Sequence, residues 1–588
     1  MQKIGAYYLG EGRYEFTVWA PLLSDLTVHI LPDRRLPLAK NKMGYFQTVV
    51  DDLSPDSRYL YITPDSAELP DPASFFQPDG IETPSLIIDH SSFPWTDHEW
   101  EGIPQAEMII YELHVGTFTE EGTFDGVISR LPYLADLGIN TIELMPVAQF
   151  PGTRNWGYDG VFPFAVQNSY GGPFGLKRLV NACHEHNISI ILDVVYNHLG
   201  PEGNCLHKFM PVFTDKYTTP WGKAINFDDA YSFGVRNFFI QNALYWLREF
   251  HIDGLRLDAL HGIFDMSAKH FLRELAEHIS LYSLHSKKKH YLFAEDDLNR
   301  TQIIEPFAQG GFGLDATWND DFHHALHTIL TGETERYYED FGSMDQLVTA
   351  IREGYVYSWE YSKYRKRFQG SFSANISPKK FIVFAQNHDQ VGNRPQGERL
   401  STLVDIEQAK LAAALVLLSP NTPLLFMGEE YGEQSPFLFF VDFHDIKIIQ
   451  SMLEGRKREI GEYANPADEK TFLASRLKWS SINEEPHKML FAYYKELIRI
   501  RKTIAFDSTR ITHNINNQLL TVLRYNLFLL INFSNTPVDY RPQLEDNWIK
   551  ELDSCDTKWQ GPGSPLPYYL PSQLVVQPKS ACIYMREQ

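Results

Sequence analysis

The stretch GLRLDA at residues 254–259 is a short apolar run that leads to a carboxylate, Asp258. The same pattern occurs in YLFAED (291–296), which reaches Glu295, and in IVFAQNHD (382–389), which reaches Asp389. Each run has the length of a buried strand, and helical segments lie between them. The pattern predicts a (β/α) barrel in which the three acids converge at the carboxyl ends of the strands.

The whole chain contains eight apolar runs of strand length. We predict strands at residues 108–114, 141–145, 188–194, 254–258, 290–295, 314–318, 381–386 and 422–427. Amphipathic stretches such as 237–249 and 268–278 predict helices between them, and 411–419 reads as a buried helix. Right-handed connections would place all these strands in one parallel sheet. The expected fold class is therefore α/β, a (β/α)8 TIM-type barrel.

The flanks of this barrel have a different pattern. Residues 1–95 carry short alternating runs such as YEFTVW (14–19), which predict an N-terminal β-sandwich resembling a carbohydrate-binding module. The catalytic barrel is expected over 96–485. A C-terminal β domain with a leading helix is expected over 486–588, with strands near 519–525, 527–532 and 581–585. Long insertions after the third and sixth barrel strands should form walls around its mouth.

Composition limits the partners. A net charge of -22 over 588 residues argues against nucleic acid and anionic membranes, whereas a neutral polar ligand is compatible with it. The four cysteines, Cys183, Cys205, Cys555 and Cys582, have no metal-ligand spacing and indicate reduced thiols. No signal segment and no long apolar run is present, so we expect a cytoplasmic protein.

The three acids match the needs of glycosidic-bond cleavage, in which one carboxylate attacks the anomeric carbon and a second, protonated one releases the leaving oxygen. We assign Asp258 as the nucleophile, held ionised by Arg256, which lies two residues earlier and faces the same way. Glu295 is the expected acid/base, with a pKa raised by desolvation. Asp389 would be the third anion, and His388 and His198 would donate hydrogen bonds to the sugar.

Each of these residues also has an ordinary structural interpretation. An aspartate after a strand is usually a helix cap or a turn residue, Arg256 could be a structural ion-pair partner, and single histidines are often part of the core. Independent capping roles do not predict that three acids follow three strands at the same end of one barrel. Their co-occurrence therefore favours the catalytic interpretation.

Four segments resemble the signature regions of the α-amylase superfamily: DVVYNH (193–198), GLRLD (254–258), AEDD (294–297) and QNHD (386–389). The resemblance implies a retaining, double-displacement mechanism with Asp258 as nucleophile, Glu295 as acid/base and Asp389 as transition-state stabiliser. It also implies which residues bind the sugar in subsite -1, namely Tyr158, Asp193, His198, Arg256 and His388.

Within that superfamily, NHLGPEGN (197–204), DDFHHAL (320–326), NHDQVGNR (387–394) and FMGEEYG (426–432) resemble the maltooligosyltrehalose trehalohydrolases over nearly the whole chain. The resemblance implies hydrolysis of the α-1,4 bond next to a terminal trehalose, downstream of a maltooligosyltrehalose synthase. Candidates for contacts at the trehalose end are Asp321, His323 and Glu429.

Two positions depart from the family pattern. Residues 260–262 are Leu-His-Gly where Val-His-Ala is expected, and Arg336 stands before Tyr337-Tyr338 where glycine is expected. Either change could tune the subsites beyond the cleaved bond. Asn197 matches a calcium ligand of many α-amylases, but trehalohydrolases generally act without a metal, so we predict no metal and no cofactor.

Three other functions remain open. Glycogen branching enzymes share this architecture, but they typically carry Ala-Glu-Glu-Ser and Ser-His-Asp-Glu where this chain has AEDD (294–297) and NHDQ (387–390). An ordinary maltooligosaccharide hydrolase is a second alternative. A non-catalytic barrel that serves as a binding subunit is a third, although such relatives usually lose the catalytic acids and carry a membrane segment.

Overall fold

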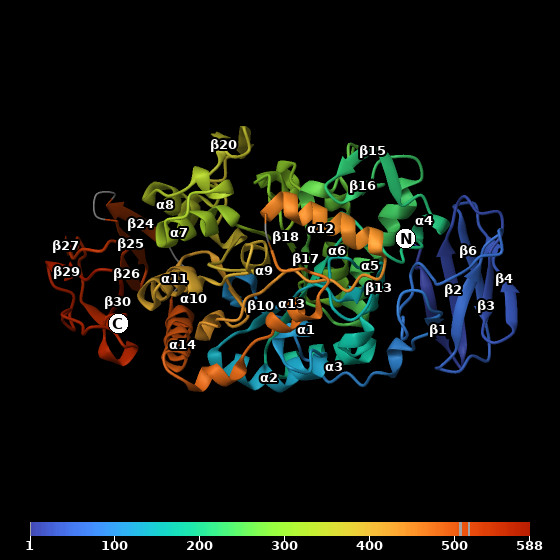
Figure 1. Ribbon diagram of the computed structural model, residues 1–588, viewed down its shortest axis with the longest axis horizontal. Helices are drawn as coiled ribbons and strands as arrows, with labels where there is room; N and C mark the ends of the chain where they lie inside the picture. The colour runs from blue at the N-terminus through green and yellow to red at the C-terminus, as the bar shows by residue number, and fades with distance from the viewer. Residues whose placement is uncertain (1, 462, 505–508, 515–517, 588) are drawn as a thin grey trace.

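A closed barrel of eight parallel strands forms the centre of the computed structural model, which describes residues 2–461, 463–504, 509–514 and 518–587 (Figure 1). Around the barrel the strands are β10 (Ile110–Leu113), β11 (Thr141–Leu144), β14 (Ser189–Val194), β17 (Gly254–Leu257), β18 (Tyr291–Ala294), β19 (Ala316–Trp318), β22 (Phe381–Val383) and β23 (Thr422–Phe426). All eight predicted strands are confirmed. Most are shorter than predicted, because the residues at their ends turn away to build loops.

Helices connect the strands and cover the outside of the barrel. They include α2 (Phe124–Leu137), α3 (Gly172–Glu185), α5 (Ser232–Glu249), α6 (Phe271–Ser286), α7 (Asp320–Thr331), α8 (Met344–Glu353) and α11 (Ile406–Leu418). Helix α6 begins later than predicted, because the His270 side chain accepts a hydrogen bond from the Leu272 amide and caps it there. Nearly every residue of α11 is buried, as its apolar sequence predicted.

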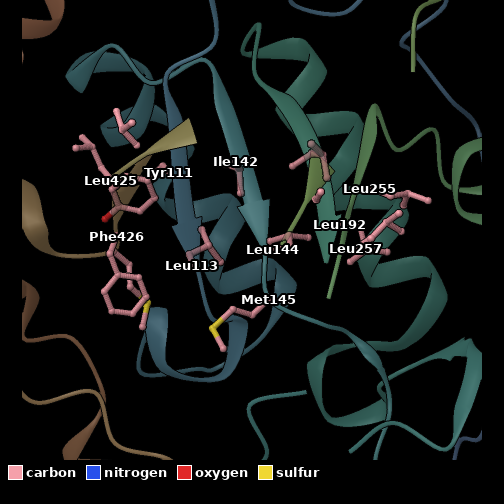
Figure 2. Close-up of a cluster of buried hydrophobic side chains, with 14 of the residues drawn as sticks. Tyr111, Leu113, Ile142, Leu144, Met145, Leu192, Leu255, Leu257, Leu425 and Phe426 are labelled. Carbon is pink, nitrogen blue, oxygen red and sulfur yellow. The ribbon is translucent and has the colours of Figure 1, made fainter. Parts of the chain in front are cut away.

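The two faces of the barrel strands bury different side chains. Tyr111, Leu113 and Leu192 belong to the large cluster that also contains the helix side chains (Figure 2). Their neighbours Ile110 and Ile191 belong to a separate cluster that contains no residue of these covering helices, and this cluster fills the barrel interior. Nearer the carboxyl ends, the inward positions become charged. They are Glu112, Glu143, Asp193 and Arg256. This charged layer is the base of the candidate site.

A two-sheet sandwich lies at one end of the molecule (Figure 1). One sheet contains β1 (Gly5–Gly10), β2 (Arg13–Trp19), β6 (Tyr45–Val50) and β5 (Ala39–Lys40), and the other contains β4 (Arg34–Pro37), β3 (Thr27–Ile30), β7 (Arg58–Ile62), β8 (Glu68–Leu69) and β9 (Ser85–Leu86). It packs on the barrel through Trp19, which lies so close to Gly234 of α5 that a Cβ there would be 2.0 Å from the indole. Only glycine fits at that point of the helix.

A five-stranded sheet lies at the opposite end (Figure 1), and helix α14 (His487–Thr503) precedes it in the sequence. Its strands are β24 (Thr509–Asn514), β25 (Leu519–Arg524), β26 (Leu527–Asn532), β30 (Ser580–Arg586) and β28 (Trp548–Asp553), and β27 (Val538–Tyr540) pairs with β29 (Leu574–Val576) beside them. The strand runs expected at the C-terminus are thus found in one sheet.

The expected insertions carry two hairpins that Figure 1 shows on the same side of the barrel. The insertion after β14 contains α4 (Leu206–Phe209), β15 (Phe213–Thr219) and β16 (Gly222–Ile225), and the insertion after β19 contains β20 (Ser358–Ser362) and β21 (Arg367–Gly370). The remaining short elements are α1 (Val115–Phe118), β12 (Ala148–Gln149), β13 (Phe162–Val166), α9 (His388–Gly392), α10 (Leu400–Leu403), α12 (Ile446–Ile460) and α13 (Glu469–Ala474). None of the helices in the described ranges has the length and apolar character needed to cross a bilayer.

Candidate active site

One buried guanidinium brings together acids from three neighbouring strands. Arg256 Nη1 donates to Asp193 Oδ2 at 2.7 Å and to Asp258 Oδ1 at 2.9 Å, and Nη2 donates to Glu295 Oε2 at 2.8 Å. The Arg256 side chain is fully buried and lies over the Trp318 ring, 4.2 Å from its centroid. Arg256 therefore fixes the positions of the nucleophile and acid/base candidates relative to each other.

Strand register explains why these side chains meet. Leu257 of β17 pairs with Ala294 of β18, so Asp258 and Glu295 leave adjacent strands at the same level. The next residue, Ala259, has a φ of 42°, a left-handed conformation that costs free energy in alanine. The turn points the Ala259 amide at Glu295, and it donates to Oε2 at 2.8 Å.

Asp389 lies beside a histidine held between two elements. The His388 ring is 2.5 Å from Glu112 Oε1 through Nδ1 and 2.8 Å from the Tyr158 hydroxyl through Nε2. Because the Tyr158 hydroxyl itself donates to Asp193 at 2.6 Å, it accepts from His388, so both ring nitrogens act as donors. Burial opposes this charge, but Asp389 and Glu112 outweigh burial and raise the pKa of His388 to about 9.

The three acids remain accessible from the surface. The side chains of Asp258, Glu295 and Asp389 are 10%, 15% and 34% exposed, whereas Arg256 beneath them is not exposed at all. A ligand can therefore reach the carboxylates, and the cation stays behind them. Arg256 lies beside Asp258, and the three acids are close enough for their charges to act on one another.

Asp258 and Glu295 share Arg256, so the pKa of each carboxyl group depends on the other. Burial and the nearby charge of Glu295 raise the pKa of Asp258 well above its usual value. Burial would also raise the pKa of Glu295, but the attraction of Arg256 and the Ala259 hydrogen bond lower it overall. Because one guanidinium serves both carboxylates, the two groups titrate as a pair, and these directions belong to the site without a sugar between them.

His198 contributes in a different way from the donor role expected of it. Its Nε2 lies 2.9 Å from the backbone oxygen of Tyr158, and burial lowers its pKa to about 4, so it is neutral near pH 7. Its single N–H is therefore used within the protein. Trp221, from the turn between β15 and β16, stacks on the His198 ring at 5.0 Å and 8°.

The departure at residues 260–262 makes room for this tryptophan. A Cβ on Gly262 would lie 3.1 Å from Trp221 Cζ3 and 3.2 Å from Asn197 Cβ, which is tighter than ordinary packing. The glycine therefore lets the indole approach the site more closely than alanine would. The other departure, Arg336, adopts a φ of 59° that glycine would adopt without strain.

Three residues proposed for the trehalose end are placed elsewhere, which corrects that expectation. Asp321 accepts hydrogen bonds from Asn299 Nδ2 and from the Val356 and Tyr357 amides, so it links α7 to the following segment. His323 is buried and packs against Phe384. Glu429 is also buried and accepts from the Tyr494 hydroxyl of α14. The three contacts are structural.

Several residues around the acids were not foreseen. Asp320, the neighbour of Asp321, accepts from Gln390 Nε2 at 3.1 Å, and burial together with the charges of Glu295, Asp297 and Asp389 raises its pKa to about 8. Arg365 Nη1 donates to Asp297 Oδ2 at 3.0 Å. Glu112 could have been recognised as a candidate site residue, because it is the one acid inside the apolar run 108–114. Arg365 had none, because its partner is far away in the sequence.

No metal centre is evident among the residues that the structure describes, since no three His, Cys, Asp or Glu side chains are grouped to hold an ion. The four cysteines are buried and unpaired.

Comparison with known proteins identifies relatives over most of the chain. Residues 72–217 match the family described as alpha amylase, catalytic domain. The malto-oligosyltrehalose trehalohydrolase of Saccharolobus solfataricus is 45% identical, over 91% of this chain and 93% of that protein. The enzyme of the same name from Mycobacterium tuberculosis H37Rv is 39% identical, over 89% and 93%.

Solved structures have the same architecture. A crystal structure from Salmonella typhimurium, provisionally described as an alpha amylase, superposes with a TM-score of 0.89 at 36% identity over the full length of both chains. The pullulanase of Anoxybacillus sp. LM18-11 in complex with maltotetraose has a TM-score of 0.73 at 18% identity, covering 99% of this chain and 87% of the pullulanase. At that identity the likeness concerns the fold alone.

Proposed function

Since this chain belongs to the maltooligosyltrehalose trehalohydrolases of the α-amylase superfamily, we propose that the acids around Arg256 perform the hydrolysis that defines the family. The bond cleaved is the α-1,4-glucosidic bond next to the terminal trehalose, and free trehalose is the product. The observation that carries this proposal is the single guanidinium that contacts both Asp258 and Glu295.

The reaction takes two steps. Asp258 Oδ attacks the anomeric carbon of the glucose in subsite -1, and Glu295 gives its proton to the glycosidic oxygen as trehalose leaves. Glu295, now ionised, then takes a proton from water, whose oxygen displaces Asp258 from the same carbon. Two inversions restore the α configuration. Asp389 accepts hydrogen bonds from the hydroxyls of the sugar, and protonated His388 beside it holds Tyr158 in place, while positive charge develops on the sugar ring.

Substrate binding should set the protonation of the pair. The first step needs an ionised Asp258 and a protonated Glu295, whereas in the free site the pKa of Asp258 is raised and that of Glu295 is lowered. We propose that a sugar ring entering between the carboxylates separates Glu295 from Arg256 and leaves Arg256 paired with Asp258. Desolvation would then favour the neutral acid and the ionised nucleophile.

The subsite -1 residues and the biological setting complete the proposal. Tyr158 and Asp193 bind the ring, Arg256 and His388 hold them in place from beneath, and His198 supports Tyr158 through the backbone. A hydrolase cannot make the trehalose end of its own substrate, so an enzyme that converts the reducing end of a glucan into trehalose must act first, as a maltooligosyltrehalose synthase does. We place both activities in the cytoplasm.

A comparison of three substrates tests the function. With maltooligosyltrehalose the protein should release free trehalose, and with plain maltooligosaccharide it should release little glucose or maltose. Extensive glucose or maltose from the plain oligosaccharide would instead identify an ordinary maltooligosaccharide hydrolase. New α-1,6 branches in amylose would identify a branching enzyme, and no turnover of any of the three would identify a binding barrel.

A further inference from the structure

The hairpin formed by β20 and β21 exposes all three of its aromatic side chains and buries two polar ones. Trp359, Tyr361 and Phe368 are 69%, 55% and 54% exposed, whereas Ser362 and Gln369 are buried. A hairpin packed on a protein normally turns its apolar side inward and its polar side toward water. This inverted pattern indicates that the three rings, which we call the aromatic face, are placed outside for a ligand.

The aromatic face is an ordered arrangement. Phe368 lies opposite Tyr361 across the hairpin, and the two rings are 5.9 Å apart at 72°. Phe368 also stacks with Trp359, at 5.8 Å and 22°. Trp359 occupies an irregularity in the strand pairing and has a φ of 70°, a conformation that side chains other than glycine rarely adopt. The strand is thus distorted at the residue that presents the largest ring.

Hydrogen-bonding groups surround one side of this face. Tyr361 also lines a cavity of about 480 Å³, together with Asp340, Gln346, Glu360 and Lys363. Sugar rings present flat C–H faces that stack on aromatic rings, and their hydroxyls need hydrogen-bond partners at the edge. A platform of rings beside carboxylate, amide and ammonium groups suits a neutral sugar, and the net charge of -22 disfavours an anionic ligand.

The buried side of the hairpin is fixed next to the reaction centre. Gln369 Nε2 donates to the backbone oxygen of Asp297 at 2.5 Å, and Arg365, in the turn, pairs with the Asp297 carboxylate. Asp297 comes two residues after Glu295. The aromatic face therefore extends outward from the rim of the site, and it is separate from the residues proposed to bind the reacting sugar.

We propose that the aromatic face of the β20–β21 hairpin binds an α-1,4-linked glucan chain. The choice of glucan rests on the proposed function, whereas the existence of a sugar platform rests on the rings and the adjoining polar cavity. The chain bound there is either the remote, non-reducing part of the substrate or a separate glucan that concentrates the enzyme on its source. Docking of a protein is less suited to a face bordered by a cavity of this size.

Glucan binding by a double variant tests the proposal. Trp359→Ala with Phe368→Ala should reduce retardation in an amylose-containing native gel, and should weaken the Kd for amylose by about tenfold. Trp359→Phe, which keeps a ring, should retain most of the binding. Tyr568→Ala is the matched control, because Tyr568 is 58% exposed in the C-terminal part and should have no effect. Circular dichroism and melting curves verify that each variant is folded.

Kinetics on two substrate lengths identify the source of the chain. If the substrate's own chain reaches the face, the double variant raises KM for maltohexaosyltrehalose and leaves maltotriosyltrehalose unchanged. If a separate glucan binds, both KM values stay constant while amylose binding is lost. If the folded double variant binds amylose as tightly as the unaltered protein, the proposal is wrong. The same result is expected if the aromatic face instead contacts another protein. Trehalose release by the unaltered enzyme is measured in parallel, so a failure of the proposed function is seen separately.

Discussion

At the scale of single residues, Arg256 organises the site. Its five N–H groups can serve several oxygens at once, and here they reach Asp193, Asp258 and Glu295 from a fully buried position. Lysine would supply the charge but could not hold two carboxylates in one plane. The spacing of Arg256 and Asp258 could be predicted from the sequence. The hydrogen bond from Arg256 to Glu295 could not be predicted, because it depends on the register of β17 against β18.

Removing either reacting carboxylate should abolish most of the activity. We expect Asp258→Asn and Glu295→Gln each to lower kcat by about 10³-fold or more, because each removes one covalent or proton-transfer step. Circular dichroism should show an unchanged fold. The measurement is kcat on maltooligosyltrehalose, and near-normal turnover in either folded variant would contradict the roles assigned here.

Glu112 should set the alkaline limit of activity through His388. The pKa of His388 is about 9, so kcat/KM should fall as the pH rises through that value and the ring stops donating to Tyr158, which then loses its position under the sugar. Glu112→Gln removes a negative charge 2.5 Å from the ring, and the limit should move to lower pH by roughly 1 unit. Measuring kcat/KM from pH 6 to 10 checks this. A purely structural role for Glu112 would lower the whole profile without shifting it.

The contact between His388 and Glu112 also makes the stability of the folded protein depend on pH. The folded pKa of His388 lies above the usual histidine value of about 6.5, so protonation favours the folded state. This contribution is complete below pH 6.5 and disappears as the pH rises through about 9. Thermal melting of Glu112→Gln should therefore differ from that of the unaltered protein at pH 6 and approach it near pH 10. An equal difference at both pH values would contradict the linkage.

At the scale of elements, the apolar runs predicted the barrel strands because a parallel strand is buried on both faces. The same reasoning could not distinguish Asp320 from Asp321, which are adjacent at the start of α7. Their contacts come from residues 299, 356, 357 and 390, which no local pattern reveals. Residues that act through such distant partners are the ones that sequence reasoning misplaced.

Asp321 should therefore matter for stability and not for substrate binding. Asp321→Asn weakens the acceptor of two backbone amides and should lower the free energy of unfolding by about 2 kcal/mol, with KM unchanged. Thermal or urea unfolding gives the first quantity and steady-state kinetics the second. Asp539→Asn, an exposed position on β27, serves as the control. A rise in KM without loss of stability would restore Asp321 to the substrate-binding set.

At the scale of the whole molecule, the sandwich, the barrel and the C-terminal sheet follow one another along the long axis (Figure 1). Strand patterns predicted the sandwich, but they could not predict how it docks. That contact depends on Trp19 fitting against a helix glycine more than two hundred residues later. We propose that the chain divides near residues 95 and 485, with the barrel between these points.

Alanine substitutions at two helix glycines test how the sandwich packs on the barrel. Gly234→Ala would place a Cβ 2.0 Å from the Trp19 ring and should lower the free energy of unfolding by about 1–3 kcal/mol. Gly455→Ala is the matched control, because a methyl group added at Gly455 of α12 would have no neighbouring atom within 4 Å and should be neutral or slightly stabilising. Equal melting temperatures for the two variants would show that the sandwich does not depend on this contact.

The central claim is that Asp258 attacks the sugar and carries it as a covalent intermediate. Treating the protein with a fluorinated α-glucosyl fluoride, which slows the second step, should trap this intermediate. Peptide mass spectrometry should then find one hexose on the peptide that contains Asp258, and none in the Asp258→Asn variant. A label on another carboxylate, or steady turnover of the reagent with inversion and no label, would contradict the account.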